Sequence, residues 1–206
     1  MPFFPKLQKF VQSLNKEFDF IEETRKALLQ QAAKQIAQLS TEKESIKLTF
    51  ICTHNSRRSM FGQIWAKTAA VWYGIDNIET YSGGTEATAF NERVVAALQR
   101  VGFKVESKGE TINPLYNIYF DDAQVPILGY SKLYNAQENP QQDFIAIMTC
   151  DHADENCPFI PGALKRMPIT YNDPKEADDT ERETEIYDER CLQIATEMFY
   201  IMSLIK

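Results

Sequence analysis

The alternation of strand-like and helix-like segments restricts the fold of this chain more than any other feature. Residues 46–51 form a β pattern, a polar loop follows, and residues 60–73 carry apolar side chains at helical spacing. A second β pattern covers residues 78–82, and residues 144–149 are a continuous apolar run, typical of a parallel strand covered on both faces. Strands that alternate with helices indicate an α/β sandwich with a parallel sheet.

Two segments lie outside this alternation. Residues 1–45 are predicted to be helical because their apolar side chains fall on one face, and we interpret them as an N-terminal extension that packs on the main domain or joins two copies in a homodimer. The main domain then covers residues 46–206. Residues 111–140 are rich in Tyr, Asn and Asp, and we interpret them as an insertion with a β-hairpin between residues 116–120 and 125–128.

Residue types that begin and end helices give further boundaries. Asn91 can cap a helix at its start, and Gly102 can end it. The apolar spacing predicts a last helix over residues 180–204.

Composition and charge exclude several classes of partner. Of the 206 residues, 44% are hydrophobic and 25% are charged, so a core can be buried without disulfides. The formal net charge of −7 does not favour binding to nucleic acid or to an anionic membrane. We expect a cytoplasmic protein, because no signal peptide or bilayer-spanning apolar run is evident. Its four cysteines should then be reduced, and be catalytic, metal-binding or incidental.

The loop of residues 52–59 carries the residue types of a site for a phosphate-shaped anion. A tight loop that leads into a helix N-terminus points backbone N–H groups inward, where they can surround a tetrahedral anion. The same positive end stabilises a thiolate, so we expect Cys52 to be a nucleophile at neutral pH. Arg58 can bind two oxygens of the anion, and Ser59 can donate to the sulfur. The predicted oxyanion-binding residues are Thr53, His54, Asn55, Ser56, Arg57 and Arg58.

Simpler interpretations apply to single residues of this loop. A lone cysteine at the end of a core strand is usually a buried structural residue. Here Cys52 coincides with Arg58, Ser59 and a strand–loop–helix pattern, which favours function. His54 and His152 could suggest a metal, but a Cys-x-His spacing is not a usual zinc ligand set, so no metal site is predicted.

The loop and a distant motif together resemble a known family. Cys52, five further residues, Arg58 and Ser59 after a first strand look like the loop of the low-molecular-weight protein tyrosine phosphatase superfamily. Asn172-Asp173-Pro174 is similar to the Asp-Pro motif of that family, although alone it would indicate only a turn. The resemblance implies a three-layer sandwich with a central four-stranded parallel sheet. It also implies that Asp173 is the general acid that protonates the leaving oxygen.

A third segment, residues 148–158, resembles one branch of this superfamily. Thioredoxin-coupled arsenate reductases place two cysteines, separated by six residues, before a proline, and Cys150, Cys157 and Pro158 match that pattern. The similarity covers about residues 46–205 apart from the insertion. It implies that the enzyme needs no bound cofactor and that thioredoxin is the external reductant. Cys191 lies in the last helix and is assigned no role.

The resemblance implies a relay of thiols. Cys52 attacks arsenic while Asp173 protonates the departing hydroxyl, and Cys150 then attacks the adduct, which releases arsenite and leaves a Cys52–Cys150 disulfide. Exchange with Cys157 gives a Cys150–Cys157 disulfide for thioredoxin to reduce. A helix would hold the Cα atoms of residues 150 and 157 ~10 Å apart, whereas a disulfide tolerates only about 7 Å. The segment must therefore loop or unwind during each cycle.

This chain departs from the family pattern at three positions. Arg57 stands where reductases often have a cysteine, and His54 where they often have a glycine. Gln63 replaces a glutamate that binds potassium in some reductases, so a cation site is not expected.

The alternative to arsenate reduction is a phosphotyrosine phosphatase that acts through a Cys52 phosphoenzyme. A third hypothesis is a non-catalytic oxyanion sensor.

Overall fold

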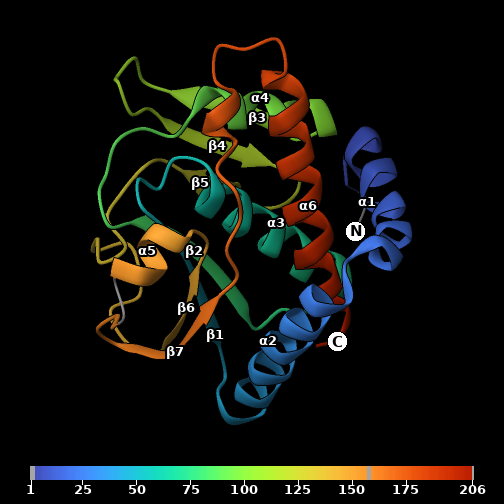
Figure 1. The fold of residues 1–206 in the computed structure, drawn as a ribbon, viewed down its shortest axis with the longest axis vertical. Coiled ribbons are helices and arrows are strands. Elements are labelled where there is room, and N and C mark those ends of the chain that lie inside the picture. Colours follow the sequence, from blue (N-terminus) through green and yellow to red (C-terminus); the bar gives the residue numbers. More distant parts are fainter. Residues whose placement is uncertain (1–2, 157–158, 206) are drawn as a thin grey trace.

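The computed structural model describes residues 3–156 and 159–205. Its centre is a four-stranded parallel sheet in the order β2-β1-β6-β7 (Figure 1). The strands are β1 (Ile46–Cys52), β2 (Ile78–Gly84), β6 (Phe144–Met148) and β7 (Ala163–Pro168). The predicted α/β fold with a central four-stranded parallel sheet is thus confirmed. The residue patterns did not mark β7, because it is an edge strand with Lys165 exposed to solvent.

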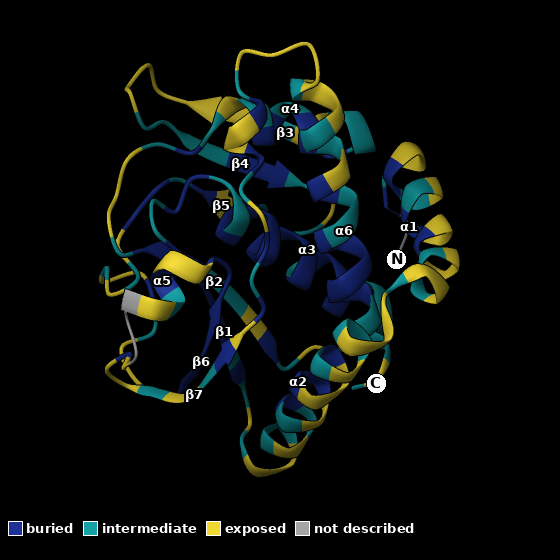
Figure 2. Ribbon diagram, viewed as in Figure 1, coloured by how far each residue is buried: buried dark blue, intermediate teal, exposed yellow. Residues whose placement is uncertain are grey.

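The two faces of the sheet bury two different apolar clusters. Alternate residues of β1 and β6, such as Phe50 and Ile147, pack into the main core with α3 (Arg58–Tyr73) and α6 (Glu183–Ser203). The intervening residues, such as Ile51 and Met148, face a smaller cluster with α5 (Asp151–Asn156). Because side chains alternate across a strand, both faces of β1 and β6 are covered, and Figure 2 shows the buried sheet between its layers.

The predicted caps of the fourth helix are confirmed. In α4 (Glu92–Val101), the side chain of Asn91 accepts a hydrogen bond from the N–H of Arg93, and Gly102 ends the helix at φ 114°. The last helix, α6, starts at Glu183, three residues later than predicted. Asp179, with φ 62°, turns the chain before it.

The N-terminal segment forms two helices with a break between them. They are α1 (Pro5–Glu17), followed by a 3-10 turn (η1, Phe18–Phe20), and α2 (Glu23–Glu42). The break occurs at Ile21, whose backbone is extended. Both helices contact α6 and bury apolar residues in the main core; these are Leu7, Val11, Leu14, Leu29, Ala32, Ala33 and Ile36. The extension therefore shares one core with the rest of the chain.

This shared core makes a stability prediction. Leu14→Ala should lower the free energy of unfolding by about 2–5 kcal/mol, because the side chain is fully buried and its removal leaves a cavity. Phe20→Ala is the matched control, since that ring is 80% exposed and its loss should change stability little. Urea denaturation of both variants measures the difference, and equal, small effects would contradict the packing of α1.

The insertion contributes two strands, β4 and β5, to a separate small sheet. β3 (Lys104–Lys108), β4 (Leu115–Tyr119) and β5 (Ile127–Gly129) pair antiparallel in that order. The predicted hairpin between the last two strands is confirmed. β3 was not predicted, because its exposed, charged residues lack a β pattern. Within the described residues, no helix is long and apolar enough to cross a membrane.

Candidate active site

Cys52 ends β1, and the chain turns at once into the loop that leads to α3. The N–H of Thr85 donates to the carbonyl of Cys52 (3.1 Å), and the N–H of Glu86 donates to that of Thr53 (2.8 Å). A Cβ atom on Gly84 would lie 2.7 Å from the carbonyl oxygen of Thr53. This close approach requires glycine at the end of β2, and it fixes the loop against that neighbouring strand.

Beneath the loop, a chain of buried hydrogen bonds positions the sulfur. The Sγ of Cys52 lies 3.1 Å from the Oγ of Ser59, and the amide of Asn55 donates to the same Oγ (2.9 Å). The Oδ1 of Asn55 accepts from the backbone N–H of Lys132 (3.0 Å). Asn55 adopts a left-handed conformation with φ 46°, which asparagine tolerates better than most residues. The hydroxyl is therefore held where it can donate to a Cys52 thiolate.

Two substitutions of Asn55 separate its side chain from its backbone. Asn55→Gly keeps the left-handed conformation but leaves the buried N–H of Lys132 unpaired, at a cost of about 1–3 kcal/mol. Asn55→Ala adds the strain of a left-handed residue, about 1–2 kcal/mol more. We expect both variants to lose activity and Ala to be the less stable in thermal unfolding. Equal stability of the two would contradict the conformational role.

Arg58 and Asp173 meet at the mouth of the loop. The Nη2 of Arg58 donates to the Oδ2 of Asp173 (2.7 Å), and its Nη1 donates to the carbonyl of Tyr171 (3.0 Å). The Nε of Arg58 is buried and has no hydrogen-bond partner among the described residues. A cavity of about 520 Å³ opens here and is lined by both side chains. An oxyanion can thus meet a guanidinium donor and a carboxyl group together.

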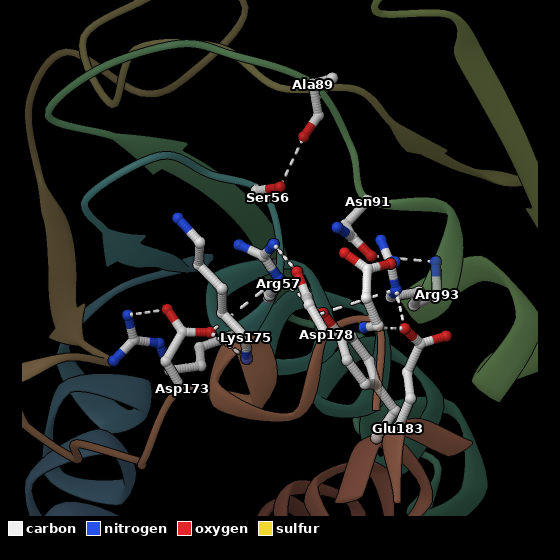
Figure 3. Close-up of polar contacts among 12 residues, drawn as sticks. Ser56, Arg57, Ala89, Asn91, Arg93, Asp173, Lys175, Asp178 and Glu183 are labelled. Atoms are coloured by element: carbon white, nitrogen blue, oxygen red, sulfur yellow. Dashed lines mark hydrogen bonds and ion pairs between the residues drawn. The ribbon is translucent and has the colours of Figure 1, made fainter. Parts of the chain in front are cut away.

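Arg57 belongs to a second polar network, on the side of α6. Its Nε donates to the hydroxyl of Tyr187 (2.7 Å), its Nη2 donates to Asp178 (3.0 Å), and it lies 4.0 Å from Asp173 (Figure 3). Burial alone would lower the pKa of Arg57, but Tyr187 and the two carboxylates outweigh it and raise the pKa. Burial and Asp178 raise the pKa of Tyr187, so this residue stays a neutral phenol. The network fixes the guanidinium of Arg57 beside Asp173.

Cys150 lies on the other side of the loop, two residues after the end of β6. Its Sγ is 3.5 Å from the Oγ1 of Thr53, and His152 Nδ1 is 3.3 Å from the same oxygen. Cys52 and Cys150 are both buried and share the smaller apolar cluster. A backbone hydrogen bond joins the ends of β1 and β6, because the N–H of Thr149 donates to the carbonyl of Ile51 (2.7 Å). Cys157 lies outside the described residues.

Two further predicted residues, His54 and Ser56, belong to the loop itself, whereas Gln63 and Cys191 were assigned no role. The carbonyl of His54 accepts from the Oγ of Ser131, and the Oγ of Ser56 donates to the carbonyl of Ala89. Both ends of the Gln63 amide are engaged, with Thr80 and Ser82. Cys191 is in the main core, where burial raises its pKa to about 12. Across the described part of the chain, no group of three His, Cys, Asp or Glu side chains could hold a metal ion.

Sequence reasoning missed several members of the site. Tyr187 and Asp178 hold Arg57, and the carbonyl of Tyr171 holds Arg58. These contacts join segments more than 110 residues apart, with separations of 130, 121 and 113 residues. No local pattern marks such partners. The position of Asp178 soon after Asp173 was the one available signal.

Fold and comparisons together define a class: an enzyme with the fold of the low-molecular-weight phosphatases, whose candidate active site holds Cys52, Arg58 and Asp173. Residues 47–122 match the family model "Low molecular weight phosphotyrosine protein phosphatase". A phosphatase of that name from Vibrio cholerae O395 has a TM-score of 0.53 and 14% identity over 77% of this chain and 95% of its own, which supports the fold alone.

Curated relatives define the family more closely. An arsenate reductase of Bacillus subtilis is 30% identical over 134 residues, which are 65% of this chain and 78% of that protein. One from Halalkalibacterium halodurans is 28% identical over 135 residues, with the same shares of the two chains. The chain belongs to the arsenate reductase family within the low-molecular-weight phosphatase superfamily.

Proposed function

We propose that this protein reduces arsenate to arsenite. The observation that carries the proposal is the second thiol beside the nucleophile loop, Cys150, held 3.5 Å from Thr53 and in the same buried cluster as Cys52. Hydrolysis of a phosphoester needs the nucleophile, an arginine and an acid, but no second thiol. Reduction needs one, because two electrons must pass from sulfur to arsenic.

The first step is a substitution at arsenic. The backbone amides of the loop and Arg58 bind the oxyanion, and the Cys52 thiolate, with Ser59 3.1 Å away, attacks the arsenic atom. An As–O bond breaks, and Asp173 gives its proton to the departing hydroxide, which leaves as water. The product is a Cys52–arsenate adduct in which arsenic is still pentavalent.

The second step transfers the electrons. The Cys150 thiolate attacks the sulfur of Cys52, an S–S bond forms, and the electron pair of the S–As bond stays on arsenic, which leaves as arsenite. Cys157 then exchanges with the new disulfide, and a thioredoxin reduces the Cys150–Cys157 bond. The cytoplasm, where such reductants act, is the compartment that we propose. A homodimer through the N-terminal helices stays a prediction for sedimentation to test.

A coupled assay tests the function. With thioredoxin, thioredoxin reductase and NADPH, arsenate should drive NADPH oxidation, and phosphate should inhibit it by competing for the loop. Mass spectrometry after arsenate exposure without thioredoxin should show a Cys150–Cys157 or Cys52–Cys150 disulfide. No turnover, under conditions where the Bacillus subtilis relative works, would overturn the proposal.

The second candidate function is phosphatase activity in the same site. The contact between Arg58 and Asp173, at 2.7 Å, favours it, because an arginine, an acid and a nucleophile suffice for phosphoester cleavage. Hydrolysis of p-nitrophenyl phosphate measures this activity. If it greatly exceeds arsenate turnover and does not depend on Cys150, the phosphatase is the better assignment. If the protein binds arsenate and phosphate but neither reduces arsenate nor hydrolyses the phosphoester, the hypothesis of a non-catalytic oxyanion sensor is favoured.

A further inference from the structure

A large cavity of about 790 Å³ lies between the insertion and the edge of the central sheet. One wall consists of residues from β5 and the turn before it, including Val125, Pro126 and Leu128. The other wall comes from α3 and β2, including Gln63 and Tyr81. None of the residues 52–59 lines it, so it is separate from the candidate active site. Its volume suits an organic molecule of ordinary ligand size.

The apolar wall of this cavity reaches the solvent. Val125 is 86% exposed and Leu128 is 49% exposed, although both are large hydrophobic residues. Ile127 and Leu115 continue the apolar lining inward. A cavity with this lining favours a ligand with an apolar body, because burial of apolar surface is the main source of such affinity.

Inside the cavity, Lys132 is a buried lysine that makes no salt bridge with another residue of the described chain. The residue is only 9% exposed, and within the described chain its ammonium makes no hydrogen bond or salt bridge. Its Nζ lies 4.7 Å from the centre of the Tyr130 ring, a cation–π contact. Buried lysines are normally paired, because an uncompensated charge costs free energy. Lys132 therefore supplies a positive charge that a ligand can neutralise.

The two acidic residues of the cavity, Glu79 and Glu138, interact with neutral hydroxyl groups as well as with lysines. Glu79 accepts hydrogen bonds from Ser45 and from Tyr81. Glu138 is exposed and interacts with the hydroxyl of Tyr130. It also attracts the ammonium of Lys132 from beyond salt-bridge distance, which raises the pKa of Lys132 less than burial lowers it. Lys67 adds a second positive charge on the α3 wall. The ammonium of Lys132 is therefore the buried charged group of this cavity that an anionic ligand can contact.

We propose that this cavity binds a small organic monoanion with an apolar body, a carboxylate or a sulfonate, whose anionic group contacts the ammonium of Lys132. The apolar body lies against Leu128, Val125 and Pro126. The cavity takes no part in the thiol chemistry proposed above. Most of its lining residues come from the insertion. It stands independently of the proposed function.

A fluorescence titration with 8-anilinonaphthalene-1-sulfonate, an apolar aromatic sulfonate, tests the site. The titration is run on the full chain in phosphate buffer, so that phosphate competes at the catalytic loop. We expect saturable binding that octanoate displaces and 1-octanol displaces at least ten times less well. Lys132→Met should weaken binding at least tenfold. Lys34→Met, at an exposed position on α2, is the matched control and should leave binding unchanged.

Two further measurements keep the test decisive if Lys132→Met fails to fold. Leu128→Asp, at a half-exposed wall position, should also weaken binding at least tenfold. Burial lowers the pKa of Lys132 to about 8, so wild-type binding should weaken between pH 7 and pH 9.5 as the ammonium loses its proton. Tyr81 and Tyr130, each with a pKa of about 12, stay neutral over this range. Binding that is insensitive to Leu128→Asp and to pH, or equal displacement by octanol, would overturn the proposal.

Discussion

Cys52→Ser should abolish arsenate reduction and p-nitrophenyl phosphate hydrolysis together, whereas Cys150→Ser should abolish only the reduction. The serine hydroxyl is not ionised at neutral pH, so both reactions lose their nucleophile, and a loss of at least about 10³-fold is expected. Cys150 lies beside the loop, 3.5 Å from Thr53, but it does not contact Arg58 or Asp173 in the described structure. Phosphoester cleavage should therefore survive its replacement.

The order of thiol chemistry gives this comparison a second readout. Cys150→Ser should still form the Cys52–arsenic adduct but release no arsenite, because the substitution removes the thiol that lies beside the loop. Cys191→Ser is the matched control, since that thiol is buried in the main core and should leave both activities intact. Steady-state arsenate turnover by Cys150→Ser at the wild-type rate would contradict the relay.

The predicted catalytic residues were easier to recognise in the sequence than the residues that position them. The nucleophile, the arginine and the serine fall within eight consecutive residues, so local sequence was enough to predict the loop. The acid required a distant motif, Asp173-Pro174, and here the turn interpretation is also correct. The Asp173 side chain accepts from the N–H of Lys175 and begins a 3-10 helix, η2 (Pro174–Ala177). One side chain thus serves the local turn and contacts Arg58.

Features that depend on tertiary contact escaped prediction. β3 and β7 are exposed strands with charged residues, and their partners, more than their own residues, hold them in a sheet. The break at Ile21 was not predicted, because the amphipathic pattern continues through it and no proline or glycine lies at that position. Lys132 is buried because its segment of the insertion is hydrogen-bonded to Gly84 and Asn55, whereas a lysine in a sequence normally indicates an exposed position.

Asp173→Asn should reduce the hydrolysis of phenyl phosphate by about 10²–10⁴-fold, the usual contribution of a general acid. Phenolate is a poor leaving group and needs the proton, whereas p-nitrophenolate leaves without much assistance. The loss with p-nitrophenyl phosphate should therefore be much smaller. The effect should fall on kcat, because the substitution removes a negative charge 2.7 Å from Arg58 and so does not weaken the binding of an oxyanion.

Asp178→Asn separates this acid role from the charge of the network. Asp178 contacts Arg57 at 3.0 Å and Tyr187 at 2.6 Å, but it makes no contact with Arg58 in the described structure. Its replacement should change both aryl phosphates by the same, smaller factor, because it alters the position of Arg57 and transfers no proton. If Asp173→Asn also changes both substrates equally, Asp173 only positions Arg58, and the proton comes from another group.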